Sequence, residues 1–423
     1  MARELEVYFE QRLVGTLVQD ESGQLRFTYH EAWLADPASV PISWSLPLRS
    51  EPFNHRETRP FFAGLLPEAE KRELVARALG VSDRNDFALL DRIGGECAGA
   101  ITLLHAGETP PPVSKEADYR LLDDGESRRI LDVLPDRPLL AGEEGVRLSL
   151  AGAQDKLPVL VVDGRIALPL HGAPSTHILK PPIRRFEDTV FNEGFCLALA
   201  KAIGLDVAAA EIRAVGDRPF LLVARYDRIR GRDGAVRRLH QEDFCQALGI
   251  VPELKYQSEG GPSLRQCFEL VRNAAARPVV DLARLLDAVL FNLFVGNRDA
   301  HGKNYSLLFT DDGVQLAPLY DVLSTDVYPG LSPRLAMKIG GKDETGAIYP
   351  RHWEHFAKEA GLAFPQVRRR LLDLARALPQ AARDVQRRFA AEGKDRPVIA
   401  RVVDVIDRET KLVIDRFASM GKV

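Results

Sequence analysis

The sequence predicts an α+β chain of two lobes, a β-rich lobe followed by a mainly helical one, with a small α+β subdomain ahead of both. Apolar and polar residues alternate, as in strands, near the N-terminus and again between residues 146 and 226. Beyond residue 227 the apolar residues recur with helical spacing. The expected domains are residues 1–108, 109–227 and 228–423, which suits a chain of 423 residues.

The first expected domain opens with a three-stranded meander. Its apolar positions form three alternating runs, namely Leu5, Val7, Phe9, then Leu13, Gly15, Leu17, then Leu25, Phe27, Tyr29. Helical patterns follow at about 60–79 and 83–92, and a strand is expected at 100–104. Residues 106–117 include three consecutive prolines, so we interpret them as a linker.

The second expected domain holds strands at 157–162, 165–170, 176–180, 209–215 and 219–226. A helix is expected at 189–203, where Gly204 ends it. The third domain is expected to contain helices at 281–294, 353–361, 365–378, 379–392 and 397–419.

Composition excludes several classes of protein. The formal charge of −3 argues against a chain that coats nucleic acid by bulk charge. The four cysteines show no C-x-x-C spacing, so neither a zinc site nor a disulfide framework is indicated, and a reducing cytoplasm is expected. The first residues contain no apolar signal core. The longest apolar run, 285–295, is interrupted and too short to span a bilayer, so no membrane association is expected.

The most informative stretch is Asn297-Arg298-Asp299-Ala300-His301-Gly302-Lys303-Asn304. It has the spacing of a protein-kinase catalytic loop, H-R-D-x-x-x-x-N, in which the Asp accepts the proton of the substrate hydroxyl and the Asn holds magnesium. The two strands expected at 305–309 and 314–317, joined by a D-D-G turn, form a hairpin that leads to Tyr320 and Asp321. Asp321 is a candidate for the second magnesium ligand.

Three further segments suit phosphoryl transfer. Lys180 ends an apolar strand, where a kinase lysine contacts the α- and β-phosphates, and Glu193 is the available helix partner. A loop rich in small residues precedes the strand at 157–162 and matches neither common glycine-rich phosphate motif; it reads Ser149-Leu150-Ala151-Gly152-Ala153-Gln154-Asp155-Lys156. Ala224-Arg225-Tyr226 ends the β-rich lobe, where a kinase hinge binds adenine.

Each of these residues also has an ordinary structural interpretation. Asp299 is of a type that often caps turns, and a strand-ending lysine such as Lys180 usually reaches solvent. For His301, Glu193 and the 224–228 segment, the residues alone leave the functional and structural interpretations open. The joint occurrence of Asp299, Asn304, the hairpin and Asp321 favours catalysis, and with it a two-lobed protein-kinase-like fold.

With these motifs in place, the chain resembles the HipA family of toxin serine/threonine kinases from bacterial toxin–antitoxin modules. The resemblance covers nearly the whole chain. It rests on residues 149–156, 176–180, 192–193, 224–228, 238–243, 297–304 and 318–322 in this order. Val322 and Leu323 stand where ordinary protein kinases have Phe-Gly after the metal-binding Asp, so the activation logic built on that Phe is not expected.

The resemblance implies an ATP and Mg²⁺ site. The nucleotide-binding residues would be Ala151, Gly152, Ala153, Gln154, Asp155, Lys156, Lys180, Ala224, Arg225, Tyr226, His301, Gly302, Lys303, Asn304, Tyr320 and Asp321. Asp299 would be the catalytic base, and Asn304 and Asp321 the metal ligands. Ser149 matches the serine that family members phosphorylate on themselves.

The resemblance also implies partners. These are a helix-turn-helix antitoxin dimer (HipB-like), operator DNA contacted mainly through that antitoxin, and a protein substrate of the aminoacyl-tRNA synthetase kind, glutamyl-tRNA synthetase being the best-known example. Phosphorylation of such a substrate would inhibit translation and promote growth arrest. Two alternatives remain open on the residues: a small-molecule kinase of the aminoglycoside type, and a catalytically silent co-repressor that binds an antitoxin and DNA.

Overall fold

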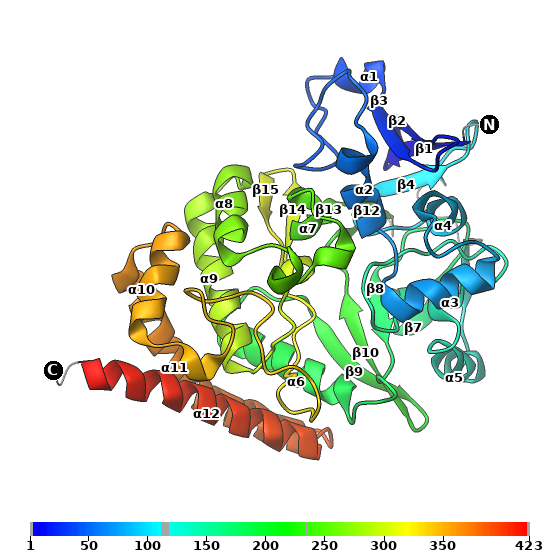
Figure 1. Cartoon of the computed structure of the whole chain (residues 1–423). Helices are drawn as coiled ribbons and strands as arrows, with labels where there is room; N and C mark the ends of the chain where they lie inside the picture. Colours follow the sequence, from blue (N-terminus) through cyan, green and yellow to red (C-terminus); the bar gives the residue numbers. More distant parts are fainter. Residues whose placement is uncertain (1–2, 111–117, 233–234, 421–423) are drawn as a thin grey trace. The chain divides into compact units, whose positions relative to one another are not determined.

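The computed structural model describes residues 3–110, 118–232 and 235–420, and the chain forms two compact units. The first unit contains Met1–Pro181, Arg213–Glu253 and Leu308–Asp311; the second contains Pro182–Ile212, Leu254–Leu307 and Asp312–Val423. Sheets dominate the first and long helices the second (Figure 1), which confirms the α+β class. The three expected domain ranges stay a prediction. Of the expected linker, residues 111–117 lie outside the described residues.

The predicted meander and the strand after it are confirmed. They form an antiparallel sheet in the order β3-β2-β1-β4, with β1 Arg3–Phe9, β2 Arg12–Gln19, β3 Leu25–Tyr29 and β4 Ile101–Leu104. Its apolar face packs on the helices α1 Glu31–Leu34, α2 His55–Gly64, α3 Ala69–Leu79 and α4 Asp86–Ile93.

The prediction of a single helix at 60–79 is wrong, because the chain forms two helices, α2 and α3, with a break between them. Pro67 lies in the break; it lacks an N–H group and disfavours helical geometry in the residue before it. Pro67 instead makes a parallel bridge to Gly152 of the predicted phosphate loop. The break therefore places residues 65–68 against that loop.

The second sheet of this unit has the order β5-β7-β6-β8-β10-β9. Its strands are β5 Tyr119–Leu121, β6 Leu157–Val162, β7 Arg165–Pro169, β8 His177–Lys180, β9 Ala210–Val215 and β10 Arg218–Ala224. Five of these were predicted. Strand β5 and the helix α5 Asp124–Val133 were missed, although Asp123 and Glu126 form a capping box at the start of α5 that the sequence carries.

Three short strands and one short helix complete the first unit: β11 Arg228–Arg230, β12 Val236–Arg238, β13 His240–Asp243 and α7 Phe244–Ala247. Glu242 of β13 is buried and reaches the segment before α2. Its carboxyl oxygens lie 2.5 Å from Ser43 Oγ and 2.8 Å from the Trp44 nitrogen. Burial raises the pKa of Glu242 from 4.5 to about 8, although these two hydrogen bonds act in the opposite direction.

Glu242 should make the stability of the first unit depend on pH. Between about 4.5 and about 8 the folded carboxyl keeps its proton while the unfolded one releases it. The stability that the chain gains from the protonated Glu242 is therefore fully present below pH 4.5 and is lost as the pH rises through 8. We expect urea-unfolding midpoints of the chain to fall across this window, and to fall less for Glu242→Gln. An identical pH dependence of the two proteins would contradict this assignment.

The second unit is built around long helices: α6 Thr189–Ala202, α8 Leu264–Ala274, α9 Pro278–Phe294, α10 Pro350–Glu359, α11 Phe364–Ala391 and α12 Pro397–Met420. The end of α6 at Gly204, which has φ +80°, is confirmed. Helix α8 was missed. The hairpin β14 Ser306–Thr310 and β15 Gly313–Leu316 was predicted and is present.

The boundary expected between residues 378 and 379 is wrong, because α11 continues through Pro379. A proline inside a helix costs about 3 kcal/mol. Eight buried side chains on both sides of Pro379 form one continuous stripe, and α11 packs along α12 and α6 (Figure 1). Burying each larger apolar side chain contributes about 1.5–3 kcal/mol, so the packing outweighs the proline.

None of the helices in the described part of the chain is long and apolar enough to pass through a bilayer.

Candidate active site

The predicted catalytic loop follows α9 in the second unit and is closed by its own hydrogen bonds. The Asn297 side chain donates to Asn292 Oδ1 at 2.8 Å and accepts from the Asp299 nitrogen at 3.2 Å. The Asp299 carbonyl accepts from the His301 nitrogen at 2.8 Å and from Asn304 Nδ2 at 3.1 Å. These contacts hold the Asp and the Asn of the motif in one short loop.

The Asp299 carboxylate is oriented by a residue that the motif does not contain. Tyr256 donates its hydroxyl to Asp299 Oδ1 at 2.5 Å, and its ring packs edge-on against His301 with centroids 5.3 Å apart. A hydrogen bond to an ionised carboxylate is among the stronger ones. Sequence reasoning missed Tyr256, because it lies outside the motif and no spacing rule links the two segments.

Asn304 presents the chemistry that magnesium requires. Because its Nδ2 donates to the Asp299 carbonyl, the orientation of the amide is fixed, and its Oδ1 is the side-chain atom that could ligate a metal ion. Among the described residues no group of three His, Cys, Asp or Glu side chains could hold a metal on its own. This is compatible with Mg²⁺, which is commonly bound by one or two protein oxygens together with substrate phosphates.

Asp321, the other predicted ligand, has φ +56°, in the left-handed region that side chains other than glycine seldom occupy. Such strain persists only where the surroundings enforce it, and it is frequent at functional sites. The neighbouring Tyr320 supplies one constraint. Its hydroxyl donates to the Lys303 carbonyl at 2.8 Å and lies 2.7 Å from Ser306 Oγ. Tyr320 therefore joins the Asp321 turn to the catalytic loop.

The segment after Asp321 is also joined to α6. Asn192 Nδ2 donates to the Ser324 carbonyl, and Asn192 Oδ1 accepts from the Ser324 nitrogen, both at 2.9 Å. The next residue along α6, Glu193, is buried. Whether Glu193 pairs with Lys180, which belongs to the first unit, stays a prediction.

In the first unit, Lys180 lies on β8, between β6 and β10, opposite Leu221. It is only 6% exposed. A lysine is almost never so buried unless its charge is paired, so the interpretation of Lys180 as a solvent-seeking strand end is wrong. Its position on a central strand is compatible with the predicted contact to the nucleotide phosphates, which stays a prediction.

The predicted phosphate loop packs on the N-terminal subdomain. Ser149 is fully buried; its Oγ donates to the Leu65 carbonyl at 2.8 Å and its nitrogen to the Glu96 carbonyl at 2.9 Å. Lys71 Nζ lies 2.8 Å from Asp155 Oδ1. The Asp155 carboxylate therefore anchors the loop, and phosphate contacts would come from other groups.

Gly152 is required by the shape of the loop. It has φ +109°, and a Cβ atom there would lie 2.5 Å from Lys156 Nζ. That ammonium group donates to the Ala151 carbonyl at 2.5 Å, so it closes the loop on itself. Ala153 is exposed and Gln154 half-exposed. The loop thus has a small-residue turn with a lysine folded over it.

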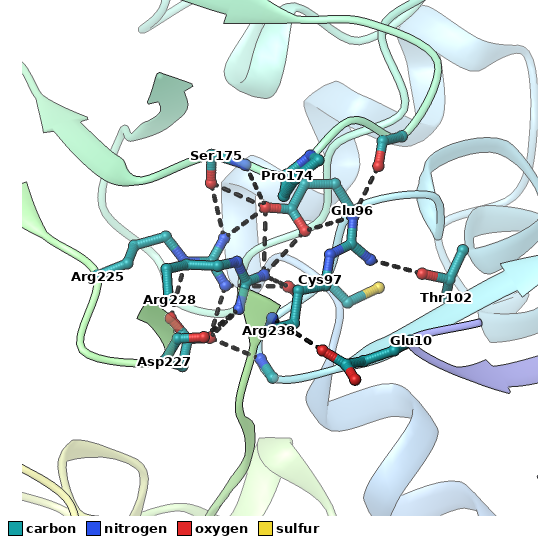
Figure 2. A network of polar contacts seen from close by, with 12 residues as sticks. Glu10, Glu96, Cys97, Thr102, Pro174, Ser175, Arg225, Asp227, Arg228 and Arg238 are labelled. Atoms are coloured by element: carbon teal, nitrogen blue, oxygen red, sulfur yellow. Dashed lines mark hydrogen bonds and ion pairs between the residues drawn. The ribbon is translucent and has the colours of Figure 1, made fainter. Parts of the chain in front are cut away.

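The 224–226 segment contains a side chain whose role is structural. Arg225 is buried in an ion network (Figure 2), where it donates to Glu96 Oε1 at 2.9 Å and makes two bonds to the Asp227 carboxylate at 2.9 and 2.7 Å. Tyr226 donates its hydroxyl to Gln241 Oε1. The Arg225 side chain is therefore occupied by this network, and contact of the segment's backbone with adenine stays a prediction.

The network in Figure 2 joins the N-terminal subdomain to the β-rich lobe through five buried charged side chains: Glu96, Arg225, Asp227, Arg228 and Arg238. Burial alone would raise the pKa of Glu96, but the three guanidinium groups lower it to about 2. Glu96 is therefore ionised at neutral pH. Sequence reasoning missed this network, since its members lie far apart in the chain.

Comparison with known proteins agrees with this architecture. The family model of the HipA-like C-terminal domain matches residues 148–382, which is more than half of the chain. The family model of the HipA N-terminal domain matches residues 5–104. The chain belongs to the HipA family. The resemblance inferred from the motifs is confirmed, and so is the kinase-like fold.

Relatives of this HipA-family chain match it over most of their length. The protein Y4mE of Sinorhizobium fredii, which is named as a kinase, is 55% identical to this chain, and the match covers 90% of this chain and 91% of Y4mE. The serine/threonine-protein kinase toxin HipA of Shewanella oneidensis is 31% identical over 90% of this chain and 89% of its own. A structure of HipA with HipB and its operator DNA from Shewanella oneidensis has a TM-score of 0.85 at 28% identity and covers 99% of each chain.

Proposed function

We propose that this chain is an ATP- and Mg²⁺-dependent serine/threonine protein kinase and the toxin of a toxin–antitoxin module. The arrangement around Asp299 is the single observation that carries this proposal. Its carboxylate is oriented by Tyr256, and its carbonyl holds the amide of Asn304. Phosphoryl transfer requires little more than such positioning and charge neutralisation.

In this proposal Asp299 accepts the proton of the acceptor hydroxyl and orients that oxygen toward the γ-phosphate. The side-chain oxygens of Asn304 and Asp321 would hold Mg²⁺. When bound there, the ion would supply positive charge that stabilises the phosphates during transfer. His301, Gly302, Lys303 and Tyr320 shape the loop around these ligands.

The first unit is proposed to supply the other nucleotide contacts. Lys180 binds the α- and β-phosphates, and the backbone amides of residues 151–156 bind phosphate oxygens. The backbone of residues 224–226 binds adenine. Support comes from the buried position of Lys180 on a central strand and from the open, small-residue turn at Ala153.

The partners are proposed from the relatives. We infer that a HipB-like helix-turn-helix antitoxin dimer binds this chain and carries it to operator DNA, as the Shewanella oneidensis complex contains HipB and operator DNA. The proposed substrate is an aminoacyl-tRNA synthetase of the glutamyl type, whose modification would inhibit translation and arrest growth. The four cysteines are buried free thiols, which supports action in the reducing cytoplasm.

Ser149 is the proposed autophosphorylation site. Its hydroxyl is buried against the Leu65 carbonyl, so phosphorylation requires the loop to leave this position. A phosphate carries about −2 charge and cannot return to a site that faces a carbonyl oxygen. Modification would therefore keep the loop displaced and weaken phosphate binding.

Intact-mass and peptide mass spectrometry after incubation with Mg²⁺ and ATP test the proposed function. We expect one added phosphate on the Ser149 peptide and phosphate on added glutamyl-tRNA synthetase. Ser149→Ala should lose only the first. Phosphate found on an aminoglycoside and on no protein would favour the small-molecule kinase, and no ATP-dependent product would favour the silent co-repressor.

A further inference from the structure

The arginine next to the proposed catalytic base is buried among carboxylates of the second unit. Its side chain is 4% exposed. Arg298 Nε and Nη2 donate to the two Asp326 oxygens at 2.9 and 2.5 Å, and Nη2 also donates to Glu409 Oε1 at 3.0 Å. Asp326 follows the Asp321 turn, and Glu409 lies on α12. Three segments distant in sequence therefore meet at one guanidinium group.

The carboxylates have a second, more exposed cation beside them. Arg408 Nη2 lies 2.7 Å from Asp326 Oδ2 and 2.9 Å from Glu409 Oε1. Asp326 and Glu409 are 11% and 5% exposed, whereas Arg408 is 57% exposed. The two inner carboxylates therefore lie between the buried guanidinium of Arg298 and the more exposed one of Arg408, and both arginines donate to them. A buried pair of this kind fixes geometry, because separating it leaves uncompensated charge.

Backbone hydrogen bonds join the same segments. The Gly296 carbonyl accepts from the nitrogens of Thr325 and Asp326 at 3.0 and 3.1 Å, and Thr325 Oγ1 accepts from the Arg298 nitrogen at 2.9 Å. A Cβ atom at Gly296 would lie 2.7 Å from Val405 Cγ1 of α12. The start of the catalytic loop, the segment after Asp321 and α12 are therefore joined by direct contacts of the backbone as well as by the ion pairs.

We propose that Asp326 and Glu409 are positioning residues that take the place of an activating phosphate. In many protein kinases a phosphorylated side chain orders the activation loop by pairing with arginine. Such a phosphate carries about −2 charge, which equals the charge of the two carboxylates around Arg298. Because both belong to the chain, the spacing of Asp299 and Asp321 is set without any phosphorylation step. This inference rests on the proposed function.

Steady-state kinetics of phosphate transfer test the inference in the full chain. We expect Asp326→Asn and Glu409→Gln each to lower kcat about 10- to 100-fold, since small misplacements of reacting groups have effects of this size. The KM for ATP should change less than about threefold, because neither residue is proposed to touch the nucleotide. The matched control is Asp404→Asn, an exposed carboxylate on the same helix, which should behave as wild type.

A second experiment tests whether the chain must be phosphorylated before it can transfer phosphate. Wild-type chain treated with a phosphatase, with complete loss of phosphate verified by intact mass, should transfer phosphate at full initial rate without a lag. A lag that disappears on phosphorylation would overturn the inference, as would an unchanged kcat in Glu409→Gln, the milder variant that retains Asp326. Transfer by neither wild type nor variants would refute the proposed function, and the inference with it.

Discussion

Asp299→Asn should lower the rate of phosphate transfer by about 10²- to 10⁴-fold, which is the usual contribution of a general base. The asparagine keeps the size of the side chain and an oxygen that can accept from Tyr256, so the loop should keep its shape. Only the ability to take a proton is lost. Transfer of labelled γ-phosphate to a protein acceptor measures the effect.

Binding of Mg²⁺ and ATP separates this effect from general damage. The affinity of the Asp299→Asn protein for ATP with Mg²⁺, measured by calorimetry, should stay within a few-fold of the wild-type value. The reason is that Asn304 and Asp321 are the proposed metal ligands. The control is Asp312→Asn, an exposed acid in the turn of the hairpin after the loop. A rate for Asp299→Asn within tenfold of wild type would show that another group takes the proton.

Glu96→Ala should have the largest effect on stability, about 3–5 kcal/mol, because it removes one partner from a buried ion network. Glu96 faces Arg225, Arg228 and Arg238, at 2.9, 2.9 and 3.4 Å. Without it, the Asp227 carboxylate alone would balance three buried guanidinium groups. Urea unfolding of the first unit, followed in the full chain, measures the loss. The matched control is Glu4→Ala on β1, an exposed acid of the same subdomain.

The low pKa of Glu96 sets the sign of the acid effect. A carboxyl whose pKa falls from 4.5 to about 2 on folding adds stability that is present above pH 4.5 and is lost as the pH falls through 2. The difference in free energy of unfolding between wild type and Glu96→Ala should therefore become smaller as the pH is lowered from 4.5 to 2. A constant difference down to pH 2 would indicate that lost packing, and not charge, explains the change.

The core of the site could be predicted because its residues are close in sequence. The Asp299–Asn304 spacing lies within one loop, and the same loop carries the hydrogen bond between them. The turn at Asp321 follows a hairpin whose two strands and D-D-G turn could be recognised in the sequence. Tyr256, Asp326 and Glu409 could not be found in this way, since each acts across a long stretch of chain and has no fixed spacing to the motif.

Two prolines show the same limit for the fold. Pro67 breaks a helix, and Pro379 lies inside one. The local chemistry is the same in both cases, since each proline lacks an N–H group. The outcome differs because a continuous buried stripe crosses Pro379, whereas Pro67 is drawn into a bridge with Gly152.

Periodicity and motif spacing alone determined the α+β class, most strands and long helices, the HipA resemblance and the candidate catalytic residues, because these depend on neighbours within a few positions. Only the tertiary structure decided that Ser149 and Lys180 are buried, that the Arg225 side chain is structural, and that Arg298 is held by two carboxylates. The reason is physical: burial and charge pairing depend on which distant segments meet, and that is settled by packing of the whole chain.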